Sequence, residues 1–422
     1  MSLIVTLRGL FADIRPLQEP HFRRLWTANI VTVIGAQLTV VAVPAQIYDL
    51  TGSSGMVGLT GVFGLVPLVV FGLWGGALAD HVDRRRLLEV TTIGLVVTSA
   101  LFWLQAALGL GNVWLLLVLF AVQQAFFAVN QPTRVAILPK LIPVVQLPAA
   151  NALNMTVMSA GAIAGPLVGG MLIPIVGYSW LYLIDAITLF ATLYAVWRLP
   201  SLPVEAPQGS PGLRSVVDGL RYLAWHRILL LSFLVDLIAM VFGMPRALFP
   251  EMAHTVFGGP VGGGTELALL YAAMPAGAVL GGVLSGWVTS VRRQGTAVLV
   301  AIAVWGAAMS LLGLAVGLAS GAARAMLIVA LMMLVVGGAA DMVSAAFRQT
   351  ILLSAADDQV RGRLQGVFIV VVAGGPRLAD VLHGSASELV GPALATGGGG
   401  LLVLLGILIV ALVAPQFRRY RA

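Results

Sequence analysis

Long apolar segments, separated by short polar ones that hold most of the charge, run along all 422 residues of the chain. A helix of about 20 apolar residues crosses the hydrocarbon of a bilayer and satisfies its own backbone hydrogen bonds there. The pattern therefore predicts an all-α membrane protein. We expect twelve spans, at residues 22–48, 55–79, 87–108, 113–135, 149–174, 179–198, 228–250, 265–289, 296–317, 322–347, 364–390 and 398–414.

Composition supports a membrane protein and excludes several functions. Hydrophobic residues make up 59% of the chain and charged residues 10%, against about 25% charged in soluble domains. There is no cysteine and no paired histidine motif, so we expect no disulfide, metal or cofactor. The runs GGPVGGG and TGGGG fall in expected extracytoplasmic loops without a following Lys-Ser/Thr, so they are not phosphate sites. With no nucleophile constellation, we predict that the protein is not an enzyme.

Positive charge marks one side of the membrane. With the N-terminus in the cytoplasm, 21 of the 24 Lys and Arg fall in cytoplasmic segments or at their junctions, as the positive-inside rule requires. The exceptions are Arg246, Arg324 and Arg377. This asymmetry predicts that both termini are cytoplasmic and explains the net charge of +7 without a nucleic-acid partner.

The chain divides into two halves that echo each other. Arg134 and Arg348 precede similar loops 214 residues apart, and Gly165-Pro166 recurs as Gly375-Pro376 after 210 residues. Parallel six-helix repeats of this kind are a transporter architecture. We predict an N-terminal bundle, a cytoplasmic linker with an amphipathic helix, and a C-terminal bundle, at residues 1–198, 199–227 and 228–422.

Two motifs indicate moving parts. GGALADHVDRRRLL joins the second and third spans, and its acid can bond an arginine or a helix N-terminus and so latch one face of the bundle. The alternative is a positive-inside loop with one surface acid. GAIAGPLVGG, in the fifth span, has small residues that let two helices touch and a proline that adds a bend. The latch set, which includes two arginines at repeat-related helix ends, is Gly76, Asp80, Arg84, Arg85, Arg86, Arg134 and Arg348; the second motif comprises Gly161, Gly165, Pro166, Gly169 and Gly170.

These motifs resemble those of the major facilitator superfamily. The loop is similar to G-x-x-x-D-R-x-G-R-R-R, with His81 and Asp83 as departures, and GAIAGPLVGG is similar to the G-x-x-x-G-P-x-x-G-G antiporter motif. VAVPAQIYDLTGSSGMVGL, MPRALFP and LYAAMPAGAVLGGVLSG resemble the branch that holds the enterobactin exporter and actinobacterial drug efflux proteins. The resemblance implies twelve helices in two pseudo-symmetric bundles in a bacterial cytoplasmic membrane. It also implies proton-driven export of a siderophore-like compound or drug.

Charged residues inside the spans need a reason, because each costs roughly 2.5–3.5 kcal/mol at the bilayer centre. Arg377, Asp380 and His383 lie on one face of the eleventh span, which the resemblance places beside a central cavity. Asp380 is either a proton carrier or a permanent counter-ion to Arg377. The proton-coupling candidates are Asp236, Asp341, Asp380 and His383, with ion pairing or simple cavity lining as the alternatives.

The expected substrate cavity draws on polar residues of both halves. Arg377 suits a substrate with negative character, whereas unpaired acids suit a cationic drug. Asp185 lies in a span that the resemblance places at the periphery, so we expect a structural role for it. The cavity candidates are Arg377, Gln37, Gln123, Gln124, Asn130 and Asn154.

We therefore predict a monomeric secondary transporter whose partners are a small amphipathic substrate, protons and lipid. The rivals are a broad multidrug antiporter, an importer or uniporter without proton coupling, and a membrane sensor that binds its ligand without moving it. The absence of a sizeable soluble domain argues against the sensor.

Overall fold

The computed structural model describes residues 13–79, 82–202, 221–355 and 358–421, and within these ranges the chain is helical with no strand. Short 3-10 or π turns lie at Arg15–Gln18, Val144–Gln146, Arg246–Leu248 (η3), Met252–Val256 and Ser285–Ser290. Of the expected linker helix, the residues up to 220 lie outside the described part of the chain, and residues 221–225 are helical. The α-helices are α2 (Pro20–Thr51), α3 (Ser54–Ala79), α4 (Arg84–Ala107), α5 (Val113–Leu141), α6 (Leu147–Trp197), α8 (Arg227–Gly243), α9 (Phe249–Glu251), α10 (Thr265–Val283), α11 (Gln294–Gly317), α12 (Ala323–Ala355), α13 (Asp358–Val413) and α14 (Pro415–Arg418).

Two of the membrane-spanning helices are interrupted by a glycine. Ten helices of the described chain are long and apolar enough to cross a membrane. Two of them, α6 and α13, are each interrupted by one non-helical glycine, Gly177 (φ 76°) and Gly391 (φ 79°). Such left-handed backbone favours glycine because it has no Cβ. If each interrupted helix counts as two spans, the ten become the twelve expected. Gly177 and Gly391 are 214 residues apart, the offset that separates Arg134 from Arg348.

Several boundaries differ from expectation; α5 and α12, for example, end at Leu141 and Ala355, beyond the expected residues 135 and 347. TGGGG, expected in a loop, is helical in α13, and Gly391 makes the corner instead. Two of its glycines, Gly397 and Gly400, pack against α11, where an added Cβ on Gly400 would meet the backbone of Ser310. The seventh span ends at Gly243, because Pro245 cannot donate a backbone hydrogen bond to continue the helix. Helix α10 ends at Val283, before the expected residue 289.

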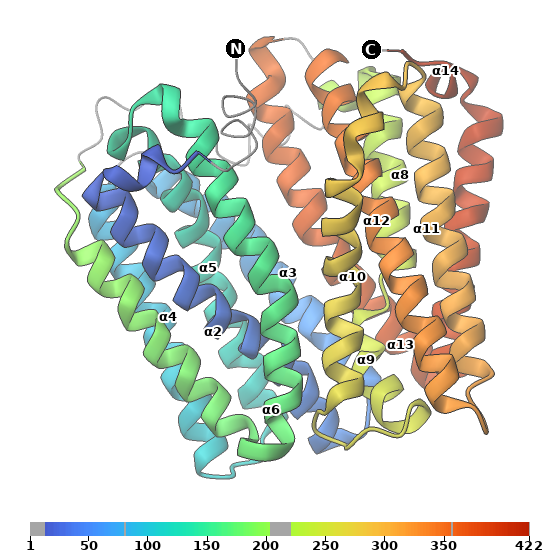
Figure 1. The fold of residues 1–422 in the computed structure, drawn as a ribbon, viewed down its shortest axis with the longest axis horizontal. Coiled ribbons are helices and arrows are strands. Elements are labelled where there is room, and N and C mark those ends of the chain that lie inside the picture. Colours follow the sequence, from blue (N-terminus) through green and yellow to red (C-terminus); the bar gives the residue numbers. More distant parts are fainter. Residues whose placement is uncertain (1–12, 80–81, 203–220, 356–357, 422) are drawn as a thin grey trace, which may run out of the picture.

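The helices pack in two groups that lie side by side (Figure 1). Helices α2 to α6 form one group, the N-terminal group, in which α2 packs on α6 and α3 on α5. Helices α8 to α14 form the other, the C-terminal group, in which α11 packs on α12 and α13. We call the end of the molecule where α2 begins and α14 lies the terminal end, and the end with the corners at Gly177 and Gly391 the far end.

Glycines bring the two groups into backbone contact. In the first part of α3 a glycine occurs at every third position, and an added Cβ on any of these four would meet a residue of α13. An added Cβ on Gly58 would lie 2.7 Å from the carbonyl oxygen of Asp380, and one on Gly61 would overlap the carbonyl oxygen of Arg377. Only glycine permits this approach. We call Gly55, Gly58, Gly61 and Gly64 the glycine ladder.

Candidate functional site

A cavity of about 600 Å³ lies between the two groups of helices. It runs from Phe22 and Trp26, near the terminal end of α2, to Arg377 and Asp380 in α13. Its wall is amphipathic, with aromatic rings beside many amides. All six predicted cavity residues line it. The lining amides are Asn29, Gln37, Gln123, Gln124, Asn130, Gln131, Asn151 and Asn154.

A cluster of two arginines and one aspartate lies at the inner end of the cavity. Arg377 Nη1 is 4.0 Å and Arg246 Nη2 is 3.5 Å from Asp380 Oδ2. Arg377 also donates to Gln124 Oε1 (3.4 Å), and its guanidinium lies 5.1 Å from the centre of the Phe120 ring. One carboxylate therefore faces two guanidinium groups, which leaves a net positive charge for an anion to neutralise.

Sequence reasoning placed Arg377 and Asp380 in the cavity but did not select Arg246. The signal was present, because Arg246 is one of the three basic residues outside the cytoplasmic segments. It lies in the 3-10 turn η3 that follows the break after α8. Its side chain is about one-third exposed, yet its Nε atom is buried and has no hydrogen-bond partner. The structure thus completes the cluster from a segment that was expected to be plain helix.

The other predicted residues of the eleventh span and of α5 are partly committed to structure. His383 does not line the cavity; it is 2% exposed and its Nε2 lies 3.1 Å from the carbonyl oxygen of Phe242. It therefore lies on the side of α13 that packs on α8. Arg377, Asp380 and His383 were expected on one face toward the cavity, but only Arg377 and Asp380 reach it. Asn130 lines the cavity but donates to the hydroxyls of Thr91 and Thr92 in α4.

Asp236 and Asp341 lie away from the cavity and share one arginine. Asp236 in α8 hydrogen-bonds Arg348 of α12, and both side chains are almost fully buried. Arg348 Nη2 also lies 3.7 Å from Asp341 Oδ1, one of the alternatives considered for that acid. The Arg348 charge compensates that of Asp236, and the pair joins α8 and α12. Arg348, expected among the latch residues, is 3% exposed here.

This ion pair gives a prediction about stability. Replacing Asp236 with alanine breaks the buried pair with Arg348 and leaves only Asp341, 3.7 Å away, to compensate the Arg348 charge. Breaking a buried pair costs roughly 3–5 kcal/mol of unfolding free energy. Glu89→Ala is the matched control, because it breaks the partly exposed pair with Arg85 (2.9 Å), whose loss costs roughly 0.2–1 kcal/mol. Thermal unfolding in detergent compares the two variants. Equal unfolding temperatures would contradict a structural role for the buried pair.

The glycines of GAIAGPLVGG pack α6 on its neighbours. Added Cβ atoms on Gly161 and Gly165 would overlap Val33 and Gln37 of α2. At Gly170 the partner is Ala268 of α10, in the other group, whose Cα would lie 2.7 Å away. Pro166 lies inside the helix. The motif therefore supports a cavity wall through α2 and also closes the far end.

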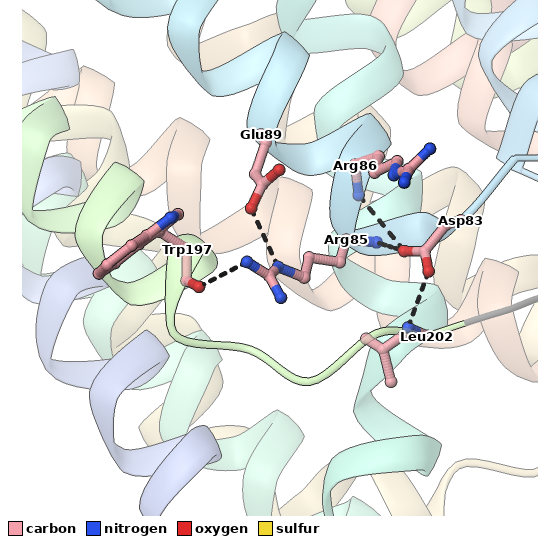
Figure 2. A network of polar contacts seen from close by, with 6 residues as sticks. All are labelled: Asp83, Arg85, Arg86, Glu89, Trp197 and Leu202. Atoms are coloured by element: carbon pink, nitrogen blue, oxygen red, sulfur yellow. Dashed lines mark hydrogen bonds and ion pairs between the residues drawn. The ribbon is translucent and has the colours of Figure 1, made fainter.

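The loop between α3 and α4 is organised by Asp83 (Figure 2). Asp83 caps α4, accepting hydrogen bonds from the backbone N–H groups of Arg85 (2.8 Å) and Arg86 (3.4 Å). Its other oxygen accepts from the N–H of Leu202 (3.1 Å), while Arg85 donates to Glu89 and to the carbonyl of Trp197.

This network fastens the start of α4 to the segment after α6, within one group of helices. At position 83, where the family motif has a glycine, this chain has an aspartate whose side chain caps α4. Of the other expected latch residues, Arg84 donates to the carbonyl of Ala136 (3.2 Å) and Arg134 lines the cavity. Asp80 lies outside the described residues, and Gly76 is within α3.

Two glutamates close the far end between the groups. Glu251 of α9 accepts hydrogen bonds from the hydroxyls of Ser54 (2.5 Å) and Ser387 (2.8 Å). Glu388 of α13 accepts from the Ser53 hydroxyl (2.7 Å) and the Gly55 N–H (2.9 Å). Together they hold the turn between α2 and α3. The cavity is therefore closed at the far end while it extends toward the terminal end.

Two groups of membrane-spanning helices around a central polar cavity define a multi-pass membrane transporter. The sequence matches the profile of the family described as "Transmembrane secretion effector" over residues 11–419. The chain therefore belongs to this family of the major facilitator superfamily, whose members are transporters and not enzymes.

Relatives of known name agree with this assignment. The enterobactin exporter EntS of Shigella boydii serotype 18 is 29% identical over 417 residues, covering 96% of this chain and 94% of the relative. EntS of Escherichia coli O157:H7 is 28% identical with the same coverage.

Solved transporters share the fold at low identity. A bacterial homologue of ferroportin in an inward-facing state superposes with a TM-score of 0.69 at 13% identity, over 95% of this chain and 99% of the other. The nucleoside transporter NupG gives a TM-score of 0.70 at 12% identity, over 94% and 98%. These likenesses support the predicted fold class.

Proposed function

We propose that the protein exports a small anionic, amphipathic compound with aromatic rings from the bacterial cytoplasm in exchange for protons. In this proposal the terminal end faces the cytoplasm of the cytoplasmic membrane, and the two groups of helices are the moving units. The observation that carries the substrate class is the cluster in which Arg246 and Arg377 face the single carboxylate of Asp380.

The rest of the cavity wall supports the same substrate class. Phe120, Phe127 and Tyr271 offer ring surfaces, and the amides offer donors and acceptors to a compound with several polar groups. Apolar walls with a few placed polar groups are typical of small-molecule sites. The relatives are named for export of enterobactin, so a catecholate siderophore is the substrate that we propose to test first.

In this proposal, the substrate enters the cavity from the terminal end and displaces Asp380 from the two arginines. A substrate with a single negative charge neutralises the net positive charge of Arg246, Arg377 and Asp380. Rearrangement then separates Glu251 and Glu388 from the turn that they hold, which opens the far end. Asp380 is the counter-ion that keeps the arginines in position between cycles, and Asp236, Asp341 and His383 hold the C-terminal group together.

Vesicles containing the purified protein test the proposal. With an imposed pH gradient, enterobactin should drive proton movement, which a pH-sensitive dye reports, and a cationic dye of similar size should not. Proton movement with the cationic dye alone would favour the multidrug antiporter. Enterobactin transport that is indifferent to the pH gradient would favour the uniporter, and either result would overturn the proposal.

A further inference from the structure

Asp185 lies in the wall of the cavity. This differs from the expectation that its span is peripheral. It lines the cavity from the second half of α6, seven residues after Tyr178, or about 10 Å along the helix at 1.5 Å per residue. Gly35 of α2 allows this approach, since an added Cβ there would lie 3.0 Å from Asp185 Oδ1. The side chain is 1% exposed. It is thus a buried acid beside the substrate space.

Its surroundings differ from those of the other membrane acids. Asp185 Oδ2 accepts hydrogen bonds from the hydroxyls of Thr39 (2.8 Å) and Ser99 (2.8 Å), and Oδ1 is buried without a partner. Asp236, Asp341 and Asp380 each lie within 4.0 Å of an arginine, whereas no ion pair among the described residues includes Asp185. A buried carboxylate without a cation is expensive to keep ionised, and it takes up a proton instead.

The neighbouring elements supply neutral groups. Helix α2 faces Asp185 with Thr39 and Gly35, α4 with Ser99, and α5 reaches Ser99 through Gln123. The ionisable neighbour among the described residues is Tyr182, one turn earlier on α6, whose hydroxyl donates to Gln46. The other charged residues of the cavity wall are Arg134, Arg246, Arg377 and Asp380, whereas the hydrogen bonds that Asp185 accepts come from the hydroxyls of Thr39 and Ser99.

A directional chain of hydrogen bonds joins Asp185 to the substrate space. Gln123 Nε2 donates to Ser99 Oγ (3.3 Å), and Ser99 Oγ donates to Asp185 Oδ2 (2.8 Å). The next residue of α5, Gln124, accepts from Arg377 in the charged cluster (3.4 Å). A substrate that donates a hydrogen bond to Oε1 of Gln123 would polarise this chain toward Asp185. Donors stabilise the carboxylate, so substrate binding would favour release of a proton from it.

We propose that Asp185 is the proton-binding site of the N-terminal group, and that the Gln123–Ser99 chain makes substrate and proton compete. Asp185 holds the proton when the cavity is empty. The proton leaves its carboxyl oxygen for cavity water when the substrate engages Gln123, and no covalent step is involved. The competition rests on the proposed exchange of substrate for protons, but the protonated state of Asp185 does not.

Infrared difference spectroscopy tests the protonated state directly. The wild type in lipid should show the carbonyl band of a protonated carboxylic acid, and Asp185→Asn should remove it while keeping an acceptor for Thr39 and Ser99. Asp380→Asn is the control and should keep the band. A band that survives Asp185→Asn, or a wild-type spectrum that responds to sodium but not to pH, would overturn the proposal.

Proton release on binding tests the competition. In weakly buffered detergent solution, enterobactin should release protons from the wild type, several-fold fewer from Ser99→Ala, and only those of the compound itself from Asp185→Asn. Equal release from wild type and Asp185→Asn would overturn the competition. If vesicles show no proton-coupled transport while the infrared band behaves as expected, the proposed function fails and the proton site stands.

Discussion

Replacing Arg377 or Arg246 with glutamine is expected to weaken binding of an anionic substrate roughly 10- to 100-fold. A hydrogen bond to a charged group contributes about 1.5–3 kcal/mol, and each 1.4 kcal/mol is tenfold in affinity. The loss should be larger when both arginines are replaced, because Asp380 then remains as an unpaired negative charge in the cavity. Equilibrium binding of enterobactin, followed by quenching of protein fluorescence, measures the affinity.

Arg324→Gln is the matched control for this pair. Arg324 is the third basic residue outside the expected cytoplasmic segments, but it is exposed at the start of α12 and does not line the cavity. Its replacement should leave the affinity unchanged. A similar loss in all three variants would show that net charge matters and the cluster does not. Unchanged affinity in Arg377→Gln would remove the basis for an anionic substrate.

Replacing Gly61 with valine is expected to keep the far end of the molecule open and to abolish net transport. The added side chain would overlap the backbone of α13 at Arg377, which cannot move aside as a flexible side chain can. Gly61 lies about two turns from Ser54, where α3 begins at the far end of the molecule. The added side chain therefore acts as a wedge near the contacts of Glu251 and Glu388. With valine at position 61, the two groups of helices could pack together only in the conformation in which they are apart at the far end.

A cysteine reporter measures this change, because the chain has no cysteine of its own. Ser387 is 6% exposed and hydrogen-bonds Glu251, so Ser387→Cys should react slowly with a membrane-impermeant maleimide. Adding Gly61→Val should raise the labelling rate at least several-fold. Gly72→Val is the control on the same helix, since a Cβ on Gly72 meets no atom within 4 Å. Equal labelling in the two variants would contradict the wedge.

The helices and much of the cavity could be predicted from the sequence because membrane insertion leaves a strong pattern. A span must be apolar, so each polar residue within it stands out, and this selected the glutamines, the asparagines and Arg377 that line the cavity; their contact with a substrate stays a prediction. The pattern does not show rotation about a helix axis, which depends on packing. His383 therefore lies against α8 although spacing placed it with Arg377.

Two further residues escaped prediction for distinct physical reasons. Arg246 follows a break at Pro245 within an apolar run, and hydropathy averages over such a break. Asp185 was set aside because its span was expected at the periphery, whereas the contact between Gly35 and α6 brings it to the cavity wall. Glycine composition was similarly ambiguous: TGGGG continues a helix because α11 packs on it, and the single Gly391 makes the corner.

The glycine ladder also affects the entropy of the transport cycle. A side chain that packs between moving helices loses rotamer freedom when they meet and regains it when they part, at up to about 2 kcal/mol for the long side chains. Glycine has no rotamers to lose. Where Gly58 and Gly61 meet the backbone of α13, the two groups can separate and rejoin without this cost. The free-energy difference between open and closed states can then be set mainly by the substrate and by the contacts of Glu251 and Glu388 at the far end.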